Sequence, residues 1–471
     1  MAEFQEINNI GIRVSEDQYQ KLKSHLFQNE NEQLAYIFAT RAVVDDEIVF
    51  IVKRVIIPAC SDIIDNSVEH VTHKFEYYHI LRLEAIDNQY SFFTVHSHRK
   101  ISPIHSKLDD ICDQNILRLL TVTNNNHHGS IIINDNGDFS ARFLENDTIH
   151  FVSINYIYIY GKKLEKRFSF ALSRTIGQKQ KNIFDRQLRF LSEDRQYMFS
   201  NFRVAIIGVG GTGSSIAHQL RRLGLGHIYL IDDDVVTESN ISRLCGSISG
   251  NEGLNKTDLI ASRLELIYNF GVIKSLPCNA FSLRALETLK MVDFIFVASD
   301  EKDLGRYITQ LVVKYYGVPA IDVGIELILD NKEGVLSDMC FRSHYLLPNE
   351  VCLFKVNTLN MNEIYGDLLY ISDPKTHVRQ IKEGYIKDKT QIVDPAVVSF
   401  NNYAASRVVS IFVRLIASKY KYSQEKRRLF DITYFPQCLD LVDCDCDFCN
   451  SVDSLRGDRD YPLDIYSWKS K

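Results

Sequence analysis

The chain has 471 residues, of which 45% are hydrophobic, so it is long and apolar enough to bury the cores of two or three domains. Its formal net charge of −6 excludes the overall basic field that is typical of nucleic-acid-binding proteins. The N-terminus lacks the features of a signal peptide, and the sequence has no apolar run of roughly 18 residues that could cross a bilayer. We therefore expect a cytoplasmic globular protein with neither a membrane nor nucleic acid as a partner.

The first part of the chain, residues 1–165, is expected to form an α+β domain. Helix-like patterns near 17–28 and 74–87 alternate with short β-rich runs. These runs are 48–55, 90–95, 131–134 and 151–154. A polar stretch rich in Lys and Gln then predicts a linker over 166–182.

From residue 183 the pattern changes to alternating strands and helices, which is typical of an α/β fold with a doubly wound, Rossmann-like parallel sheet. Expected strands are 203–208, 227–232, 273–277, 292–298 and 318–323, and expected helices are 213–223, 255–268 and 302–316. This core is expected to span 183–330. Residues 331–455 are interpreted as an irregular crossover, a helix at 397–418 and a Cys-rich tail, and residues 456–471 as a polar tail.

A glycine motif, Gly208-x-Gly210-x-x-Gly213, follows the first of these strands and opens a helix. Such glycines let the backbone approach a phosphate at the positive end of a helix. With Asp232 ending the next strand, the motif alone would fit an NAD or FAD site equally well. Residues farther along the chain favour a nucleoside triphosphate site over a hydride-transfer site, because they include cations that could bind a triphosphate and carboxylates that could bind magnesium. They are Asp234, Asn240, Arg243, Lys256 and Asp300.

On these residues, 180–330 resemble the ThiF-type adenylation domain that ubiquitin-activating enzymes share with the adenylyltransferases of molybdopterin and thiamine biosynthesis. The resemblance implies ATP and Mg²⁺ as cofactors. It assigns the ATP site to Gly208, Gly210, Gly211, Gly213, Asp232, Asp234, Asn240, Arg243, Lys256 and Asp300, with Asp300 also holding the magnesium ion. It further implies a homodimer in which Arg186 reaches the ATP site of the partner subunit.

A second motif lies in the N-terminal domain, where His96-x-His98 ends a β-run. Histidines at i and i+2 of a strand project to the same side, so both imidazoles can bind one metal ion. Asp109, on a following helix, is the candidate third ligand. Without Ser106 and Asp109 at their offsets, an ordinary pair of strand histidines would be the better interpretation.

This motif resembles the JAMM (JAB/MPN) metalloproteases, which cleave ubiquitin-like proteins from targets or trim their tails. The resemblance implies a Zn²⁺ site on His96, His98 and Asp109, with Ser106 stabilising an oxyanion. It assigns the general base to Glu32 on the first helix, with Glu30 as the fallback. Arg99 stands where the family usually has proline, which changes the loop but removes no ligand.

The cysteines leave several interpretations open. By resemblance to conjugating members of the activating family, Cys352 or Cys340 is a candidate thioester nucleophile, and a buried thiol or a leftover half-site is the alternative for Cys352. Cys446 and Cys449 match half of the family's structural zinc site.

Together the motifs predict a bifunctional enzyme that activates a ubiquitin-like protein and hydrolyses amides made from it, with a conjugating enzyme as a further partner. The resemblance to bacterial conjugation operons also associates the chain with antiphage defence. A sulfur-carrier adenylyltransferase with a carrier-trimming protease is the alternative. A scaffold with an inactive hydrolase domain is the third hypothesis.

Overall fold

The computed structural model describes residues 9–68, 71–99, 102–124, 126–145, 150–299, 303–330, 335–350, 352–356, 358–384, 386, 396–417, 448 and 454–458. The chain divides into two compact units. The N-terminal unit comprises Gln5–Thr175 and Leu455–Pro462, and the C-terminal unit comprises Met1–Phe4, Ile176–Ser454 and Leu463–Lys471. In the described part of the chain, no helix combines the length and the apolar character needed to cross a membrane.

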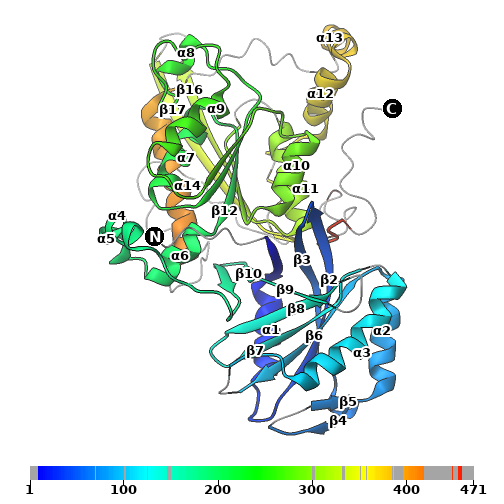
Figure 1. Cartoon of the computed structure of the whole chain (residues 1–471). Coiled ribbons are helices and arrows are strands. Elements are labelled where there is room, and N and C mark those ends of the chain that lie inside the picture. The colour runs from blue at the N-terminus through cyan, green and yellow to red at the C-terminus, as the bar shows by residue number, and fades with distance from the viewer. Residues whose placement is uncertain are drawn as a thin grey trace. The chain divides into compact units, whose positions relative to one another are not determined.

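The N-terminal unit is built on a mixed sheet whose described strands follow the order β11-β10-β1-β3-β2-β6-β7-β8-β9 (Figure 1). The strands are β1 (Ile10–Ser15), β2 (Leu34–Val44), β3 (Glu47–Ile56), β6 (Ser91–His98), β7 (Gly129–Asn134), β8 (Phe139–Leu144), β9 (Phe151–Ser153), β10 (Tyr156–Tyr160) and β11 (Leu164–Phe168). A separate pair is formed by β4 (Ile63–Asn66) and β5 (Val71–His73), which follow the short 3₁₀ helix η1 (Cys60–Asp62). The helices are α1 (Glu16–Leu26), α2 (Phe75–Asp87) and α3 (Lys107–Asn124).

Strand β2 shows how this sheet is buried on both faces. Its side chains alternate, so that Ile37 belongs to the same core cluster as Leu22 of α1. Phe38 points to the opposite face and belongs to a second cluster with Leu81 of α2. Complete burial of a side chain such as Phe38 stabilises the fold by roughly 1.5–3 kcal/mol.

One expectation for this unit was wrong. Residues 34–36 were expected on a helix that also carried Glu32, whereas they begin β2, because the apolar run that starts at Leu34 is buried on both faces of a sheet. The sheet also continues beyond residue 165 through β11, so the unit extends to Thr175. Part of the expected linker is helical in α4 (Gln178–Ile183).

The C-terminal unit confirms the doubly wound α/β fold. Its six-stranded sheet has the order β14-β13-β12-β15-β16-β17, in which every neighbouring pair is parallel except β16 and β17. The strands are β12 (Arg203–Ile207), β13 (His227–Ile231), β14 (Val272–Leu276), β15 (Phe294–Val297), β16 (Ala320–Asp330) and β17 (Val335–Leu346).

Helices cover both faces of this sheet, with α7 and α14 on one side and α10 and α11 on the other (Figure 1). Besides α4, the helices are α5 (Asp185–Leu188), α6 (Glu193–Ser200), α7 (Gly211–Arg222), α8 (Glu238–Ile241), α9 (Lys256–Glu265), α10 (Leu283–Met291), α11 (Asp303–Tyr316), α12 (Met361–Ser372), α13 (Pro374–Lys382) and α14 (Val398–Ala417).

The crossover was expected to be irregular to about residue 390, but it contains β17, α12 and α13.

Strand β12 occupies the position at which the strand order reverses. Its last residue, Ile207, is in register with Ile231 of β13 on one side and with Val297 of β15 on the other. The three strands therefore end level with one another. In doubly wound sheets, ligands bind at the carboxyl ends of the strands at this switch point.

A buried ion pair ties the sheet to α11. The Asp322 carboxylate is inaccessible to solvent, accepts a hydrogen bond from Arg306 Nε at 2.7 Å, and lies 3.2 Å from His344 Nδ1. Burial by itself would raise the pKa of Asp322, but Arg306 and His344 outweigh it and lower the pKa to about 2. The carboxylate is therefore ionised in the folded protein.

We predict that Asp322→Ala lowers the free energy of unfolding by about 3–5 kcal/mol, because it leaves the Arg306 charge buried without its partner. Asp185→Ala is the matched control, since it breaks an exposed pair with Arg189 at 3.0 Å and should cost no more than about 1 kcal/mol. Urea unfolding followed by far-UV circular dichroism measures both. Equal losses in the two variants would contradict the prediction.

Candidate functional site

The glycine motif forms a tight loop between β12 and α7. Gly208 has φ of +83°, and a Cβ there would lie 2.7 Å from the Ala298 carbonyl oxygen. A Cβ on Gly213 would lie 1.8 Å from the Gly208 carbonyl oxygen. Gly210, in contrast, has no atom within 4 Å of its Cβ position. The outer two glycines thus permit close packing, while Gly210 leaves the start of α7 accessible to a ligand.

Asp232, directly after β13, holds this loop. One of its carboxylate oxygens accepts a hydrogen bond from Val209 N at 2.6 Å, and the other accepts one from Asp234 N at 2.9 Å. Burial raises the pKa of Asp232, although Lys256 and these two N–H groups oppose that shift. A carboxylate offers about four lone-pair sites, so Asp232 can still accept a hydrogen bond from a ligand hydroxyl.

Two cations lie near the loop. Lys256, at the start of α9, is 9% exposed and its Nζ contacts Asp234 Oδ2 at 2.8 Å. Arg243 Nη1 donates to the Ser239 carbonyl oxygen at 2.8 Å, and its Cγ lies 3.5 Å from the Cβ position of Gly211. The structure therefore brings both predicted phosphate-binding side chains to the carboxyl edge of the sheet.

Asn240 and Arg186 lie on helices α8 and α5, and the remaining candidates assigned from the sequence to this unit are in β17 or outside the described residues. Asn240 caps α8, because its Oδ1 accepts a hydrogen bond from Thr237 N at 3.1 Å. Arg186 is exposed on α5. Asp300, Cys446 and Cys449 lie outside the described residues, and Cys340 is in β17.

The Cys352 thiol is buried, with 1% of the residue exposed. A thioester nucleophile must be reached by the activated carboxyl group, and a buried cysteine is usually inert. The burial of Cys352 therefore favours the buried-thiol alternative over the catalytic role that the sequence suggested.

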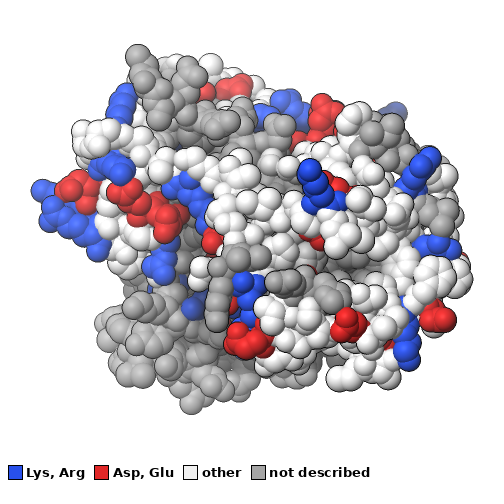
Figure 2. Space-filling model, turned by 60° about the horizontal axis from the view of Figure 1, so that its bottom comes forward, with Lys and Arg blue, Asp and Glu red and all other residues white. Residues whose placement is uncertain are grey.

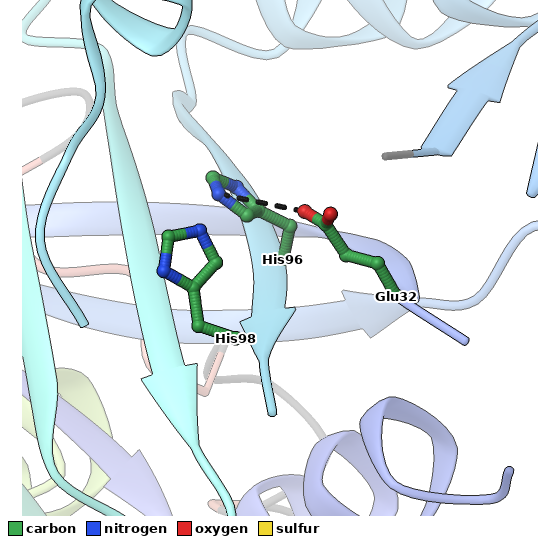
Figure 3. Close-up of side chains that lie close together, drawn as sticks. All are labelled: Glu32, His96 and His98. Carbon is green, nitrogen blue, oxygen red and sulfur yellow. Dashed lines mark ion pairs between the residues drawn. The ribbon is translucent and has the colours of Figure 1, made fainter. Parts of the chain in front are cut away.

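The second candidate site is a cluster of metal-binding side chains in the N-terminal unit (Figure 3). One ligand atom from each of Glu32, His96 and His98 lies within 4.8 Å of the other two. His96 Nε2 is 3.7 Å from Glu32 Oε1 and 3.6 Å from Asp109 Oδ1. These separations are too long for hydrogen bonds, and they are close to the spacing of two ligands around one tetrahedral ion.

Pairing between β2 and β6 positions this cluster. Ser97, between the two histidines, donates its N–H to the Gln33 carbonyl oxygen at 3.1 Å, and its Oγ accepts from Gln33 N at 2.9 Å. The neighbouring Glu32 donates its N–H to the Ser67 carbonyl oxygen at 2.7 Å. Its own carbonyl accepts from Asn66 Nδ2 at 3.0 Å. The backbone of Glu32 is therefore held on both sides, with its side chain directed to His96.

The protonation states of the cluster suit a cation. Burial lowers the pKa of His96 to about 4, so the imidazole is neutral and its lone pair is available. His98 Nδ1 lies 3.4 Å from the Ser102 carbonyl oxygen, an orientation that leaves Nε2 for a ligand. Burial, followed by the charge of Asp109, raises the pKa of Glu32 to about 7, which is suitable for a general base.

Ser106 and Asp109 also cap α3. Asp109 Oδ2 accepts from Ser106 N at 2.6 Å, and Ser106 Oγ accepts from Asp109 N at 3.1 Å. Burial would raise the pKa of Asp109, but His96 and the hydrogen bonds from Ser106 lower it. The cap fixes the carboxylate while Oδ1 faces His96. The fallback base, Glu30, is 72% exposed in its side chain and pairs with Arg99 at 3.5 Å.

His105 lies in the loop just before Ser106 and α3. Its ring nitrogens lie 3.1 Å from Ser130 Oγ and 3.3 Å from Ser140 Oγ. Burial, followed by the charge of Arg142, lowers the pKa of His105 to about 3, so it is neutral.

Charged side chains of both signs are interspersed on the face drawn in Figure 2. Basic and acidic residues alternate there over the described part of the chain, so this face carries no field of a single sign.

We predict that Gly213→Ala destabilises the protein by about 1–3 kcal/mol, because its methyl group would overlap the Gly208 carbonyl. Gly210→Ala should change stability by less than about 0.5 kcal/mol, since its Cβ position is open. Urea denaturation of the two variants tests this difference. Similar midpoints would show that the loop geometry is different from the one described.

Among the comparisons with known proteins, the family match lies in the C-terminal unit. The family description "ThiF family" matches residues 184–431. The adenylyltransferase and sulfurtransferase UBA4 of Eremothecium gossypii is 28% identical over 156 residues, which are 32% of this chain and 35% of that protein. The tRNA threonylcarbamoyladenosine dehydratase of Escherichia coli is 32% identical over 96 residues, 20% of this chain and 36% of that protein. The ubiquitin-like modifier-activating enzyme 5 of Arabidopsis thaliana is 35% identical over 95 residues, 20% of this chain and 22% of that protein.

Among solved structures, Escherichia coli MccB is 19% identical, with a TM-score of 0.38, and the match covers 52% of this chain and 64% of that chain. The chain spans about a third or less of the length of these curated relatives. The family match itself covers more than half of the 471 residues. With its glycine loop at the switch point of a doubly wound sheet, the chain belongs to the ThiF family.

Proposed function

We propose that the C-terminal unit is an ATP-dependent adenylyltransferase that activates the C-terminal carboxylate of a ubiquitin-like or sulfur-carrier protein. The observation that carries this proposal is the carboxyl edge of β12, where Gly210 is open, the next residue Gly211 adjoins Arg243, and Lys256 lies beside Asp234. Relatives named as adenylyltransferases and as a ubiquitin-like modifier-activating enzyme support it.

In the proposed reaction, the backbone at Gly210 and Gly211 approaches the phosphates of ATP, and Asp232 accepts a ribose hydroxyl. A carboxylate oxygen of the substrate attacks the α-phosphorus. The bond from that phosphorus to the bridging oxygen breaks, and pyrophosphate leaves with its electron pair. Arg243 and Lys256 stabilise the charge that develops on pyrophosphate. Magnesium would accompany ATP, with Asp300 as the expected carboxylate.

The burial of Cys352 bears on the step after adenylation. Because its thiol is shielded, we propose that the adenylate passes to an acceptor group other than Cys352. That group is the thiol of a conjugating enzyme or a sulfur donor. Both routes start from the same acyl adenylate, so the first step is common to the two alternatives raised by the sequence.

Removal of either cation should weaken ATP binding. We predict that Arg243→Ala and Lys256→Ala each raise the Kd for MgATP by about 10-fold to 100-fold, since a hydrogen bond to a charged group contributes about 1.5–3 kcal/mol. Arg284→Ala, an exposed cation on α10, is the control and should bind normally. Isothermal titration calorimetry makes the measurement, and unchanged binding in both site variants would refute the phosphate assignment.

We propose a second activity, metal-dependent amide hydrolysis, for the N-terminal unit. The observation that favours it is the convergence of Glu32, His96 and His98 on one point, with Asp109 beside His96. Two neutral imidazoles and a carboxylate are the donors that zinc takes in hydrolases, so the residues fit the ion. When bound, zinc supplies Lewis-acid chemistry that polarises an amide carbonyl.

The residues of the chain have separable roles in this proposal. His96, His98 and Asp109 would hold the ion. Glu32, with its pKa near neutrality, would take a proton from the attacking water and return it to the leaving amine. Ser106, whose hydroxyl also hydrogen-bonds the Asp109 carboxylate, would turn its hydroxyl hydrogen to the developing oxyanion.

The separation of roles is testable. His98→Ala should lose zinc, whereas Glu32→Gln should keep zinc and lose at least about 100-fold in hydrolysis, as expected when a general base is removed. Glu30→Gln is the matched control two residues away and should retain both. Zinc is measured by plasma mass spectrometry, and cleavage with a ubiquitin-like protein extended at its C-terminus. Loss of zinc from Glu32→Gln would make Glu32 a ligand and not the base.

A further inference from the structure

Helices α7 and α14 lie side by side and pack along their length (Figure 1). Ala404 and Ala405 of α14 are completely buried, and Gln219 Nε2 donates to Ser406 Oγ at 3.2 Å between the two helices. The small alanines permit close approach of the two helices. The first turn of α14 thereby reaches the first turn of α7, where the glycine loop ends.

The contact at this point is made by Asn401. A Cβ on Gly211 would lie 2.2 Å from Asn401 Nδ2 and 3.0 Å from Asn401 Cγ. The side-chain amide therefore occupies the space into which any side chain at position 211 would project. Gly211 is required here by the presence of Asn401, and not by a positive φ, since its φ is outside that region.

Asn401 also binds the next residue of the loop. Thr212 Oγ1 donates to Asn401 Oδ1 at 3.3 Å. The Asn401 backbone is fixed by the helix, because its N–H donates to the Val397 carbonyl oxygen at 3.1 Å. One amide thus connects α14 to two consecutive residues at the N-terminus of α7, where a phosphate would bind.

The amide points its nitrogen toward the loop. Asn401 Nδ2 makes no hydrogen bond to any of the described residues, although it lies against Gly211. Its partially positive N–H groups add to the positive end of the α7 dipole, on the side where Arg243 approaches Gly211. A negative charge at position 401 would face the same space.

We propose that Asn401 is a positioning residue of the nucleotide site, which holds Gly211 and Thr212 in the phosphate-binding conformation and keeps the electrostatic potential at the start of α7 positive. The proposal rests on the nucleotide site proposed above. It assigns a role in ligand binding to a residue that lies almost 190 positions from the glycine loop in sequence.

The test compares Asn401→Asp with Asn402→Asp, which adds the same charge one position along the helix on an exposed residue. We expect Asn401→Asp to raise the Kd for MgATP by at least about 10-fold and to leave the Kd for adenosine within about 2-fold. Asn402→Asp should bind both ligands normally. A purely structural role of Asn401 would weaken both ligands together, and equal ATP binding by the two Asp variants would also overturn the proposal.

Two further variants keep the test valid if Asn401→Asp does not fold. Thr212→Val removes the hydrogen bond from the other side, and its effect on ATP binding should not add to that of Asn401→Ala. Gly211→Ala should weaken ATP binding in the wild-type background and be tolerated with Asn401→Ala, which removes both clashing atoms. If the effects of Thr212→Val and Asn401→Ala on ATP binding add up, the contact between Asn401 and Thr212 is not supported. If Asn401→Ala does not restore ATP binding to Gly211→Ala, the contact between Asn401 and Gly211 is not supported.

The experiment separates this inference from the proposed function. If the wild-type protein does not bind MgATP, or if Arg243→Ala and Lys256→Ala both bind it normally, the proposed nucleotide site is wrong. If those two results are as expected and the Asn401 variants behave like Asn402→Asp, only the positioning role is wrong.

Discussion

The close approach of Gly208 to the end of β15 is the constraint on which the C-terminal unit depends. The backbone leaves β12 between two strands that end level with it, and it must pass within contact distance of the Ala298 carbonyl. A residue with a Cβ cannot do so at φ of +83° without strain. This passage allows Gly213 to contact the Gly208 carbonyl, so α7 begins directly over the edge of the sheet. The positive end of α7 and the Asp232 carboxylate are consequently presented on the same side of the loop.

In the N-terminal unit, the register of β2 against β6 has the comparable role. Leu34 pairs with His96 in antiparallel register, so the chain just before β2 lies opposite the end of β6 that carries His98. A shift of one residue would turn Glu32 to the other face of the sheet and separate it from both histidines. The hydrogen bonds between Ser97 and Gln33 fix that register next to Glu32 and the two histidines. The same strand pairing that buries Phe38 and Ile37 therefore also brings Glu32, His96 and His98 together.

The sequence predicted what is encoded locally. The glycine loop, Asp232 and the doubly wound sheet could be found because each depends on residues close together in the chain or on a repeated pattern. Glu32 was assigned to the first helix by the family resemblance. The apolar run after it is a strand buried on both faces, and such a strand gives no period of two that would have corrected this assignment. The Asp322–Arg306 pair and the contact of Asn401 with Gly211 depend on packing between elements that are distant in sequence. No local sequence pattern predicts such packing. The same holds for Cys352, whose burial is a property of the folded unit.

The two proposed reactions require active sites of different charge. This difference is consistent with the location of each site in a separate unit. Adenylation needs a positive site for a triphosphate, provided by Arg243, Lys256 and the start of α7. Metal-dependent hydrolysis needs neutral imidazoles and carboxylates in a site of low polarity, where burial keeps His96 deprotonated. Each unit has its own sheet and its own core, so one site can be tuned without disturbing the other. The reactions are nevertheless complementary, because hydrolysis of an amide releases a carboxylate and adenylation consumes one. A single protein with both sites could therefore generate the substrate of its own second reaction.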